Sequence, residues 1–205
     1  MLAASEIRAT DLACVRAGRT IFRSVNLQVG KGRFLSVTGP NGVGKTSLLR
    51  VLAGFIPPAE GSVSITSGDR QIDDGDERAS YVGWLGHSDA ARAQLSAREV
   101  LAFFAQLYGM DHAVDDGLRE VGLGAAADLP CQYLSAGQKK LLSLARLKLS
   151  GRPVWLLDEP LASLDTRARG LVAHFIGEHC ANEGIAIAAT HETLDFAGDT
   201  LRLGT

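Results

Sequence analysis

The chain has 205 residues, which is enough for one well-filled domain, 1–205, and too few for two. Its 21 basic and 23 acidic residues give a net charge of −2, so it lacks the excess of Lys and Arg that nucleic-acid-binding surfaces carry. No apolar run approaches the roughly 20 residues of a membrane span, and the N-terminus does not resemble a signal peptide. We therefore expect no nucleic-acid partner, and membrane association only through other proteins.

The three cysteines, Cys14, Cys131 and Cys180, are widely spaced and include no CxxC pair. An odd number without such a pair indicates neither a zinc site nor a disulfide framework. We interpret all three as buried thiols of a cytosolic protein.

The N-terminal third of the sequence has the pattern of β-strands. Segments 7–15 and 20–29 are β-rich and separated by glycine-containing turns, which predicts an antiparallel layer. The run FLSVT at 34–38 predicts a buried strand, and the following TSLLRVLAG has helical spacing that ends at Gly54. Strands at 62–66 and 81–85 are expected to form a second pair, with the polar segment 67–78 between them as a solvated turn.

The remaining sequence alternates helices with strongly apolar strands. LSAREVLAFFAQLYG and AGQKKLLSLARLKLS predict amphipathic helices, and Ser96 and Glu99 have capping-box spacing. The runs at 153–157 and 185–189 are apolar throughout, which is typical of parallel strands covered by helices on both faces. The predicted fold class is α/β with a mostly parallel sheet, a core of about 1–87 and 151–205, and a helical insertion of about 88–150.

A phosphate-binding loop is predicted between the 34–38 strand and the helix after it, because residues 39–46 fit GxxxxGK[ST]. Its glycines let backbone N–H groups face one cavity, and the helix N-terminus adds partial positive charge there. Lys45 would reach the β- and γ-phosphates of ATP, and Thr46 would offer its hydroxyl to Mg²⁺. The expected ATP contacts of this loop are Gly39, Pro40, Asn41, Gly42, Val43, Gly44, Lys45, Thr46 and Ser47.

Asp158 and Glu159 follow the apolar strand VWLL directly. A parallel strand delivers such residues to the edge of the sheet where α/β folds bind ligands. We expect Asp158 to hold the hydration shell of Mg²⁺ and Glu159 to polarise the water that attacks the γ-phosphate.

In this order the motifs resemble those of the ATP-binding subunits of ABC transporters, over nearly the whole chain. LSAGQ at 134–138 resembles the signature sequence, SLD at 163–165 resembles the D-loop, and His191 resembles the switch histidine. The resemblance implies a P-loop ATPase of the ABC type whose catalytic residues are Lys45, Glu159 and His191. It also implies a head-to-tail dimer in which each copy contacts the other's ATP through Ser135, Ala136, Gly137, Gln138 and Asp165.

Three positions depart from the common pattern of that family. Ala136 stands where glycine is usual, and its methyl group should be tolerated if its φ is negative. His87 stands where a metal-sensing glutamine is usual and becomes a candidate Mg²⁺ contact. Arg16 replaces the aromatic residue that commonly stacks on adenine; a guanidinium can stack on a base, although a solvated arginine explains the position equally well.

Several segments further resemble the ATPase subunits of the haem exporter of bacterial cytochrome c maturation, the CcmA type. They are CVRAGRTIF at 14–22, the Gly86-His87 pair, LSAREVLAFF and the wording LSAGQ. This resemblance implies an integral-membrane partner contacted around 87–99, at the cytoplasmic face of the inner membrane, and ATP turnover coupled to haem delivery to or from a periplasmic chaperone. The histidines lack a companion axial residue, so we expect this chain itself to bind no haem.

Other functions of the same fold remain open at this point. They include an ATPase for another transported substrate and an assembly ATPase with soluble partners, as in iron–sulfur cluster building. A translation or repair factor is less suited, because such ABC proteins need tandem units or a long coiled coil.

Overall fold

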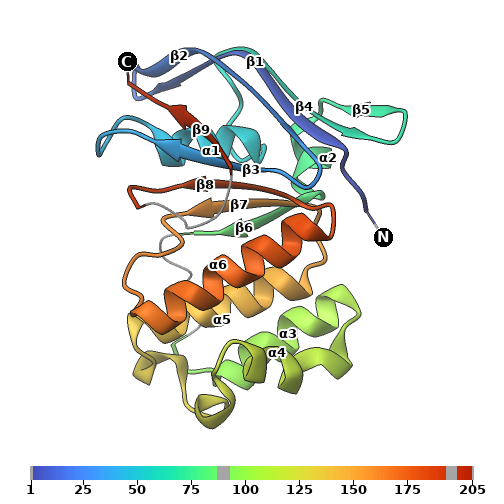
Figure 1. Cartoon of the computed structure of the whole chain (residues 1–205), viewed down its shortest axis with the longest axis vertical. Coiled ribbons are helices and arrows are strands. Elements are labelled where there is room, and N and C mark those ends of the chain that lie inside the picture. Colours follow the sequence, from blue (N-terminus) through green and yellow to red (C-terminus); the bar gives the residue numbers. More distant parts are fainter. Residues whose placement is uncertain (1, 87–92, 193–197, 205) are drawn as a thin grey trace.

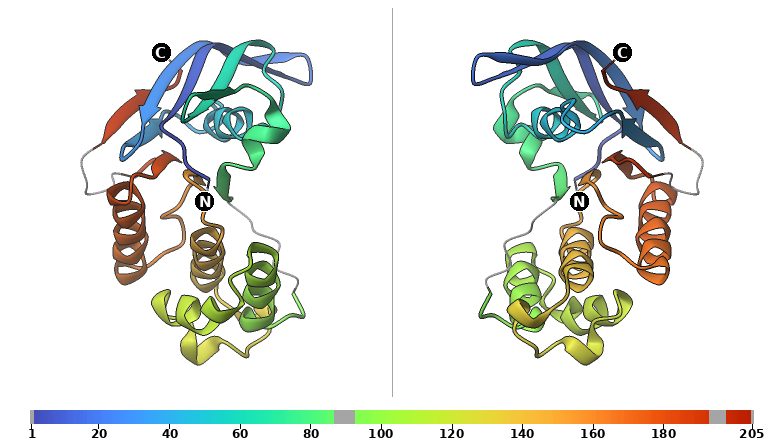
Figure 2. Two further views of the ribbon diagram at one scale, coloured as in Figure 1. Left: turned by 90° about the vertical axis from the view of Figure 1, so that its right-hand side faces the viewer. Right: turned by 90° about the vertical axis from the view of Figure 1, so that its left-hand side faces the viewer.

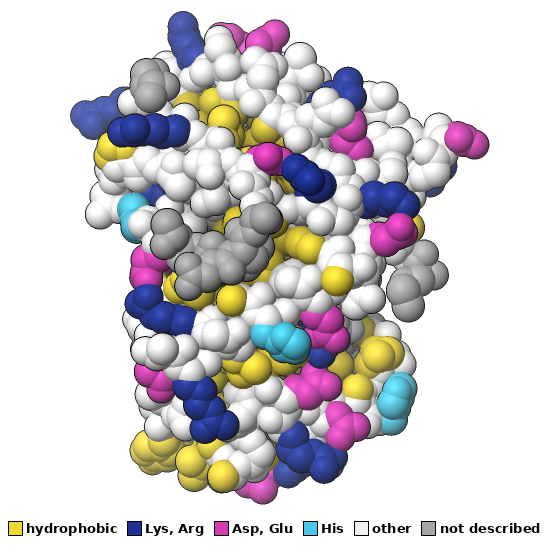
Figure 3. All heavy atoms as spheres, in the orientation of Figure 1, with side chains coloured by type: hydrophobic (Ala, Val, Ile, Leu, Met, Phe, Trp, Pro, Cys, Tyr) yellow, Lys and Arg dark blue, Asp and Glu magenta, His cyan; other side chains and the backbone are white. Residues whose placement is uncertain are grey.

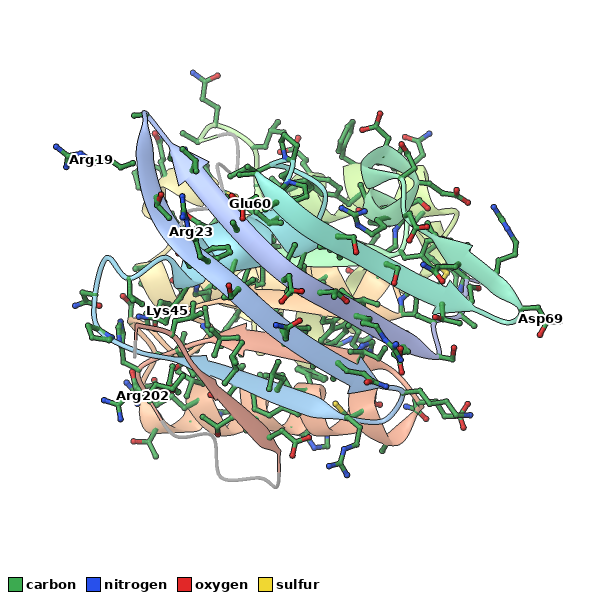
Figure 4. All side chains as sticks on the ribbon, turned by 90° about the horizontal axis from the view of Figure 1, so that it is seen from above. Arg19, Arg23, Lys45, Glu60, Asp69 and Arg202 are labelled. Atoms are coloured by element: carbon green, nitrogen blue, oxygen red, sulfur yellow. The ribbon has the colours of Figure 1, made fainter. Side chains whose placement is uncertain are left out.

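Two β-sheets and two layers of helices are stacked along the long axis in the computed structural model, which describes residues 2–86, 93–192 and 198–204 (Figure 1). The first sheet has the strand order β2-β1-β4-β5 and is antiparallel throughout. Its strands are β1 (Glu6–Arg16), β2 (Arg19–Gly30), β4 (Glu60–Ser67) and β5 (Arg70–Ile72). Seen from above, the labelled Arg19, at the start of β2, and Asp69, in the turn between β4 and β5, lie at opposite ends of this sheet (Figure 4). The predicted N-terminal antiparallel layer is thus confirmed.

The second sheet is parallel and has the strand order β6-β7-β8-β3-β9. Its strands are β3 (Phe34–Thr38), β6 (Val82–Leu85), β7 (Val154–Asp158), β8 (Ile185–Ala189) and β9 (Asp199–Arg202). Every residue of β7 and β8 is buried, because helices or the antiparallel layer cover both faces of these central strands.

The expected pairing of segments 62–66 and 81–85 is wrong. The first lies in β4 of the antiparallel sheet, and the second lies largely in β6, which pairs with β7 of the parallel sheet. The physical reason is burial, since Val82, Gly83 and Leu85 are all buried whereas β4 begins with three exposed residues. A strand that is covered on both faces belongs inside the layered core.

Helices fill the spaces beside the parallel sheet. α1 (Lys45–Leu52) packs between the two sheets, and α5 (Ala136–Leu149) and α6 (Thr166–Ala181) cover the opposite face (Figure 2). Beyond them lie α3 (Ala97–Tyr108) and α4 (Val114–Glu120), with the short 3₁₀ turns η1 (Asp111–Ala113), η2 (Gly124–Ala126) and η3 (Cys131–Tyr133). The predicted capping box of Ser96 and Glu99 is present at the start of α3. No helix in the described ranges has the length and apolar character needed to cross a bilayer.

The expectation that the polar segment 67–78 forms a plain solvated turn is wrong. The segment contains β5 and most of α2 (Gly75–Ala79). Asp74 caps α2 by accepting a hydrogen bond from the backbone N–H of Glu77. Arg78 is only 3% exposed and donates hydrogen bonds to the carbonyls of Val63, at 3.0 Å, and Asp73. Burial lowers the pKa of its guanidinium below the usual value, and these carbonyls replace water only for Nη1, since the buried Nε has no hydrogen-bond partner among the described residues.

The cysteines agree only in part with the expectation of buried thiols. Cys14 and Cys131 are buried, whereas Cys180 is partly exposed, with its sulfur 3.6 Å from the carbonyl of Arg33. Cys180 lies in the last turn of α6, which is close to the surface, so its side chain is not enclosed as those in the core are. Burial raises the pKa of all three thiols.

Candidate functional site

The octet 39–46 connects β3 to α1, and its backbone accepts only glycine at two positions. Gly39 and Gly44 have φ values of 141° and 109°. A Cβ on Gly39 would lie 2.6 Å from the carbonyl oxygen of Leu203, and a Cβ on Gly44 would lie 2.4 Å from Cγ2 of Ile21. The loop can therefore follow its tight path only because these two side chains are absent.

Lys45 begins α1 and is 7% exposed. Its Nζ donates to the carbonyls of Gly39, at 2.9 Å, and Pro40, at 3.2 Å, and lies 3.4 Å from Nδ1 of His191. These partners hold the ammonium group against the loop, next to the open end of α1.

Thr46 and Asp158 meet although 112 residues separate them in the sequence. The Thr46 hydroxyl lies 2.9 and 3.1 Å from the two carboxylate oxygens of Asp158 and donates to this group. Asp158 is 4% exposed and ends β7, which lies two strands away from β3 in the parallel sheet. The common strand direction therefore brings both oxygen-bearing side chains to one edge.

Glu159 and His191 form a second close pair at this edge. Nε2 of His191 lies 2.9 Å from Oε1 of Glu159, and the imidazole is 42% exposed. Glu159 has a φ of 47°, and its backbone N–H donates to the carbonyl of Ala189 at 2.8 Å. The imidazole thus touches Lys45 through one ring nitrogen and Glu159 through the other, an arrangement that the separate sequence motifs do not reveal.

These groups open into a cleft of about 1110 Å³. Its walls are Arg16, Ala17, Ile21, Asn41, Gly42, Gly44, Lys45, Thr46, Ser47, Arg50, Asp158, Glu159, Ala162, His191 and Glu192. Ala17, Ile21, Arg50, Ala162 and Glu192 were not predicted as site residues. Arg16 enters the wall from the end of β1, and Figure 4 shows Lys45 at the same end of the molecule as Arg19, the first residue of β2.

The segment 135–138 caps α5 and is absent from the described walls of this cleft. Ser135 and Gln138 form a reciprocal capping box, with bonds of 2.9 and 3.1 Å. Ala136 is the first residue of α5 and does not have a positive φ, so its methyl group is tolerated as expected. A Cβ on Gly137 would lie 3.2 Å from the carbonyl oxygen of Ser163, so this segment packs against the 163–165 loop.

Two predicted site residues need separate mention. Asp165 caps α6 by accepting from the backbone N–H of Ala168 at 2.8 Å, and it also does not line the cleft. His87 lies outside the described residues.

On the face in Figure 3, basic and acidic side chains are interspersed.

A comparison with protein-family models shows to which family the chain belongs. The family model for ABC transporters matches residues 22–162. The chain belongs to the ABC transporter ATPases.

Curated relatives narrow the branch of the family. This ABC ATPase is 44% identical over 194 residues to the cytochrome c biogenesis ATP-binding export protein CcmA of Nitrobacter winogradskyi, covering 94% of the chain and 95% of the relative. It is also 44% identical over 197 residues to the protein of the same name from Methylococcus capsulatus, covering 93% of each. These identities extend well beyond the short motifs and confirm the CcmA-type resemblance.

Solved structures confirm the fold. An ABC transporter ATP-binding protein from Pyrococcus furiosus superposes with a TM-score of 0.83 at 22% identity, covering 97% of this chain and 98% of the other. A nucleotide-free ATP-binding cassette from another ABC transporter gives a TM-score of 0.80 at 18% identity, covering 96% and 87%.

Proposed function

We propose that this ABC ATPase hydrolyses ATP to power haem export and haem-chaperone release in bacterial cytochrome c maturation. The observation that carries the proposal is a cleft in which a phosphate-binding loop, a Thr–Asp pair and a Glu–His pair converge, in a chain similar to CcmA proteins over almost its full length. ATP binding and hydrolysis follow from the family, and the transported species follows from the resemblance to the CcmA type.

Lys45 is the residue that we assign to the β- and γ-phosphates. Its ammonium group is already positioned by two backbone carbonyls of the loop. An ammonium group is a compact point charge with three donors, so it can exchange carbonyl partners for phosphate oxygens without moving far. The backbone N–H groups at the start of α1, together with Asn41 and Ser47 in the wall, would surround the same phosphates.

Thr46 and Asp158 would hold Mg²⁺, because a hydroxyl and a carboxylate are the oxygen ligands that this ion prefers. Their separation of 2.9 Å places both oxygens on one small patch of the cleft wall. The described residues contain no group of three or more His, Cys, Asp or Glu that could hold a metal. In such sites Mg²⁺ is commonly bound by one or two protein side chains, and phosphate and water oxygens supply its other ligands. When bound, the ion neutralises charge on the transferred phosphoryl group.

Glu159 and His191 are assigned to the reacting end of ATP. The carboxylate of Glu159 would accept a proton from the attacking water, for which its position in the cleft wall suits it. His191 orients this carboxylate through the 2.9 Å contact and would contact the γ-phosphate. Arg16, from the end of β1, is assigned to the adenine side of the same cleft.

The second half of the site would come from another copy of the chain. Ser135, Ala136, Gly137, Gln138 and Asp165 do not line the cleft that contains Lys45. The N-terminus of α5 nevertheless has the N–H groups and partial positive charge that favour an anion. In a two-fold head-to-tail dimer each copy would present this segment to the ATP held by its partner.

The membrane subunits are proposed to dock around residues 87–99, and the chain to act at the cytoplasmic face of the bacterial inner membrane through them. Apolar side chains are exposed beside this segment. Phe55 is 54% exposed, and the centre of its ring lies 5.3 Å from that of Trp84. Phe103 of α3 is 60% exposed. Arg146 connects the two regions, because it donates to the carbonyl of Trp84 and its Cζ lies 4.9 Å from the centre of the Phe104 ring. Exposed apolar side chains near one another favour a protein partner.

Replacing Glu159 by Gln tests the reaction. We expect steady-state ATP hydrolysis by the membrane-extracted complex to fall at least about a hundredfold, because general-base catalysis contributes roughly 10²- to 10⁴-fold. ATP binding and ATP-dependent association should remain, since the amide keeps the shape of the side chain. Lys45→Ala serves as the contrasting variant, which should lose binding as well as turnover.

Undiminished hydrolysis by the Glu159→Gln variant would refute the role of Glu159. The transport assignment is tested separately by co-purification from detergent-solubilised membranes. Recovery with an integral-membrane subunit supports it, whereas exclusively soluble partners would overturn it in favour of an assembly ATPase.

A further inference from the structure

Arg169, in the first turn of α6, contacts two loops that meet near the nucleotide cleft. Its Nη1 and Nη2 donate to the two carboxylate oxygens of Glu192, the second bond measuring 3.1 Å. Its Nε donates to the carbonyl of Leu164 at 3.0 Å. All three nitrogens of the guanidinium are therefore used, in the fork geometry that fixes direction as well as distance.

Stability alone does not account for this arrangement. The side chains of Arg169 and Glu192 are 41% and 37% exposed. Ion pairs with this much solvent contact contribute little to folding, because water and salt screen the charges. What the fork provides is a fixed distance between the two loops that it joins.

The first of these loops leads to His191. Glu192 directly follows His191, and its backbone N–H donates to the hydroxyl of Thr190 at 3.0 Å. Thr190 is 1% exposed, and its own backbone N–H donates to the carbonyl of Val37 in β3 at 3.1 Å. His191 is thus held on one side by a buried threonine and on the other by a glutamate whose carboxylate is fixed by Arg169.

The second loop, 162–165, leads to the surface proposed for the partner copy. Ala162 lines the nucleotide cleft, and the carbonyl of Ser163 lies against Gly137 of the α5 capping segment. Ser163 has a φ of 65°, so this loop makes a sharp bend before Leu164. A displacement of the loop by an approaching partner would therefore move the carbonyl to which Arg169 is bonded.

We propose that Arg169 is a positioning residue that transmits the position of the 162–165 loop to His191 through Glu192. The inference rests on the proposed function, because it concerns His191 as a residue of the reaction site. In this role Arg169 touches neither ATP nor the attacking water. Its guanidinium sets where the imidazole stands relative to Glu159 and Lys45 when the two copies close.

The test uses the membrane-extracted complex and four variants: Arg169→Met, Arg169→Lys, Glu192→Gln and the double variant Arg169→Met/Glu192→Gln. We expect Arg169→Met and Glu192→Gln each to lower kcat for ATP hydrolysis about tenfold, while KM changes less than about twofold, because misplacing a catalytic group costs rate more than binding. Arg169→Lys should fall between wild type and Arg169→Met, since it keeps the charge and loses the fork. The double variant should be no slower than the single variants, because both remove one connection.

Arg167→Met, on the exposed side of the same helical turn, is the matched control and should retain wild-type kcat. Unchanged kcat in Arg169→Met, or losses that multiply in the double variant, would overturn the proposal. A loss of kcat that is matched by a fall in melting temperature and a parallel rise in KM would show a general structural role and overturn it as well.

The outcome can be separated from failure of the proposed function. If Glu159→Gln abolishes hydrolysis while the Arg169 variants behave like wild type, only the inference about Arg169 fails. If Glu159→Gln hydrolyses ATP normally, the assignment of the reaction site fails first.

Discussion

Two glycines of the phosphate-binding loop allow the cost of backbone strain to be separated from the cost of a steric clash. Gly42 and Gly44 both have positive φ, at 78° and 109°. A Cβ added to Gly42 has no neighbour within 4 Å, whereas a Cβ added to Gly44 would lie 2.4 Å from Cγ2 of Ile21 and 3.3 Å from Cδ1 of Phe22. The variants Gly42→Ala and Gly44→Ala therefore share a positive φ and differ in how closely the added Cβ approaches its neighbours.

The expected loss of unfolding free energy follows from these contacts. An alanine with positive φ costs about 1–2 kcal/mol, which is the full expected loss for Gly42→Ala. Overpacking adds about 1–3 kcal/mol in Gly44→Ala, giving a total of about 2–5 kcal/mol. For a chain of this size, 1 kcal/mol corresponds to about 2–4 °C in melting temperature. Gly44→Ala should therefore melt clearly below Gly42→Ala, by several degrees.

Thermal and urea unfolding of the two variants and wild type, with and without ATP, would measure these differences. Adding Ile21→Ala to Gly44→Ala removes the atom that the new Cβ would meet. We expect this double variant to recover part of the gap to Gly42→Ala. Equal stabilities for Gly42→Ala and Gly44→Ala, or no recovery with Ile21→Ala, would refute the account of a close approach between this loop and Ile21.

Two further predictions concern a proposed Mg²⁺ ligand, Thr46, and a half-buried histidine, His179. Thr46→Val keeps the shape of the side chain but removes the hydroxyl that faces Asp158, so the Mg²⁺ concentration for half-maximal ATPase rate should rise about tenfold; an unchanged Mg²⁺ titration would count against Thr46 as a ligand. His179 stacks on Trp155 with ring centres 3.9 Å apart, and burial lowers its pKa from 6.5 to about 4. Between pH 6.5 and pH 4 the imidazole is protonated in the unfolded chain but neutral in the folded protein. The stability that His179 contributes is therefore present above pH 6.5, and the free energy of unfolding falls by about 3 kcal/mol as the pH drops through 4. Urea unfolding at pH 7 and pH 4 should show a smaller acid loss in His179→Phe than in wild type, with the exposed His174→Phe as the control, and equal losses in all three proteins would disprove the assignment.

The features that the sequence predicted correctly are those that one local rule decides. The place of the octet 39–46 between β3 and α1 follows from its residue types and the strand before it, and β7 and β8 are apolar along nearly their whole length. The capping box of Ser96 and Glu99 depends on two residues three positions apart. In each case the determining contacts lie within a few residues of one another.

Strand partners could not be obtained in this way. Segments 62–66 and 81–85 both look like strands, but their pairing depends on which layer covers them. β9 was not predicted at all, because only Leu201 of its four residues is even partly buried. It is held by backbone pairing with β3, in which Val37 lies opposite Leu201, and a backbone ladder leaves little trace in side-chain pattern.

The same limit applies within the candidate site. Sequence motifs predicted Lys45, Glu159 and His191 separately, but not that one imidazole lies between the other two side chains. Arg169 and Glu192 were not predicted because no motif relates an arginine to a glutamate 23 positions away. Such contacts exist only once α6 and the loop after β8 have been brought together by the parallel sheet.

The arrangement around His191 has a consequence for the order of events in the cleft. Nζ of Lys45 donates to the carbonyls of Gly39 and Pro40 and lies 3.4 Å from Nδ1 of His191. Phosphate oxygens would be stronger partners than neutral carbonyls, so ATP draws Lys45 away from these contacts. The imidazole that loses Lys45 on its Nδ1 side is the one that orients Glu159 through Nε2. Under the proposed function, phosphate binding at Lys45 therefore changes the surroundings of the Glu159 carboxylate, which activates water, because the imidazole of His191 contacts both side chains.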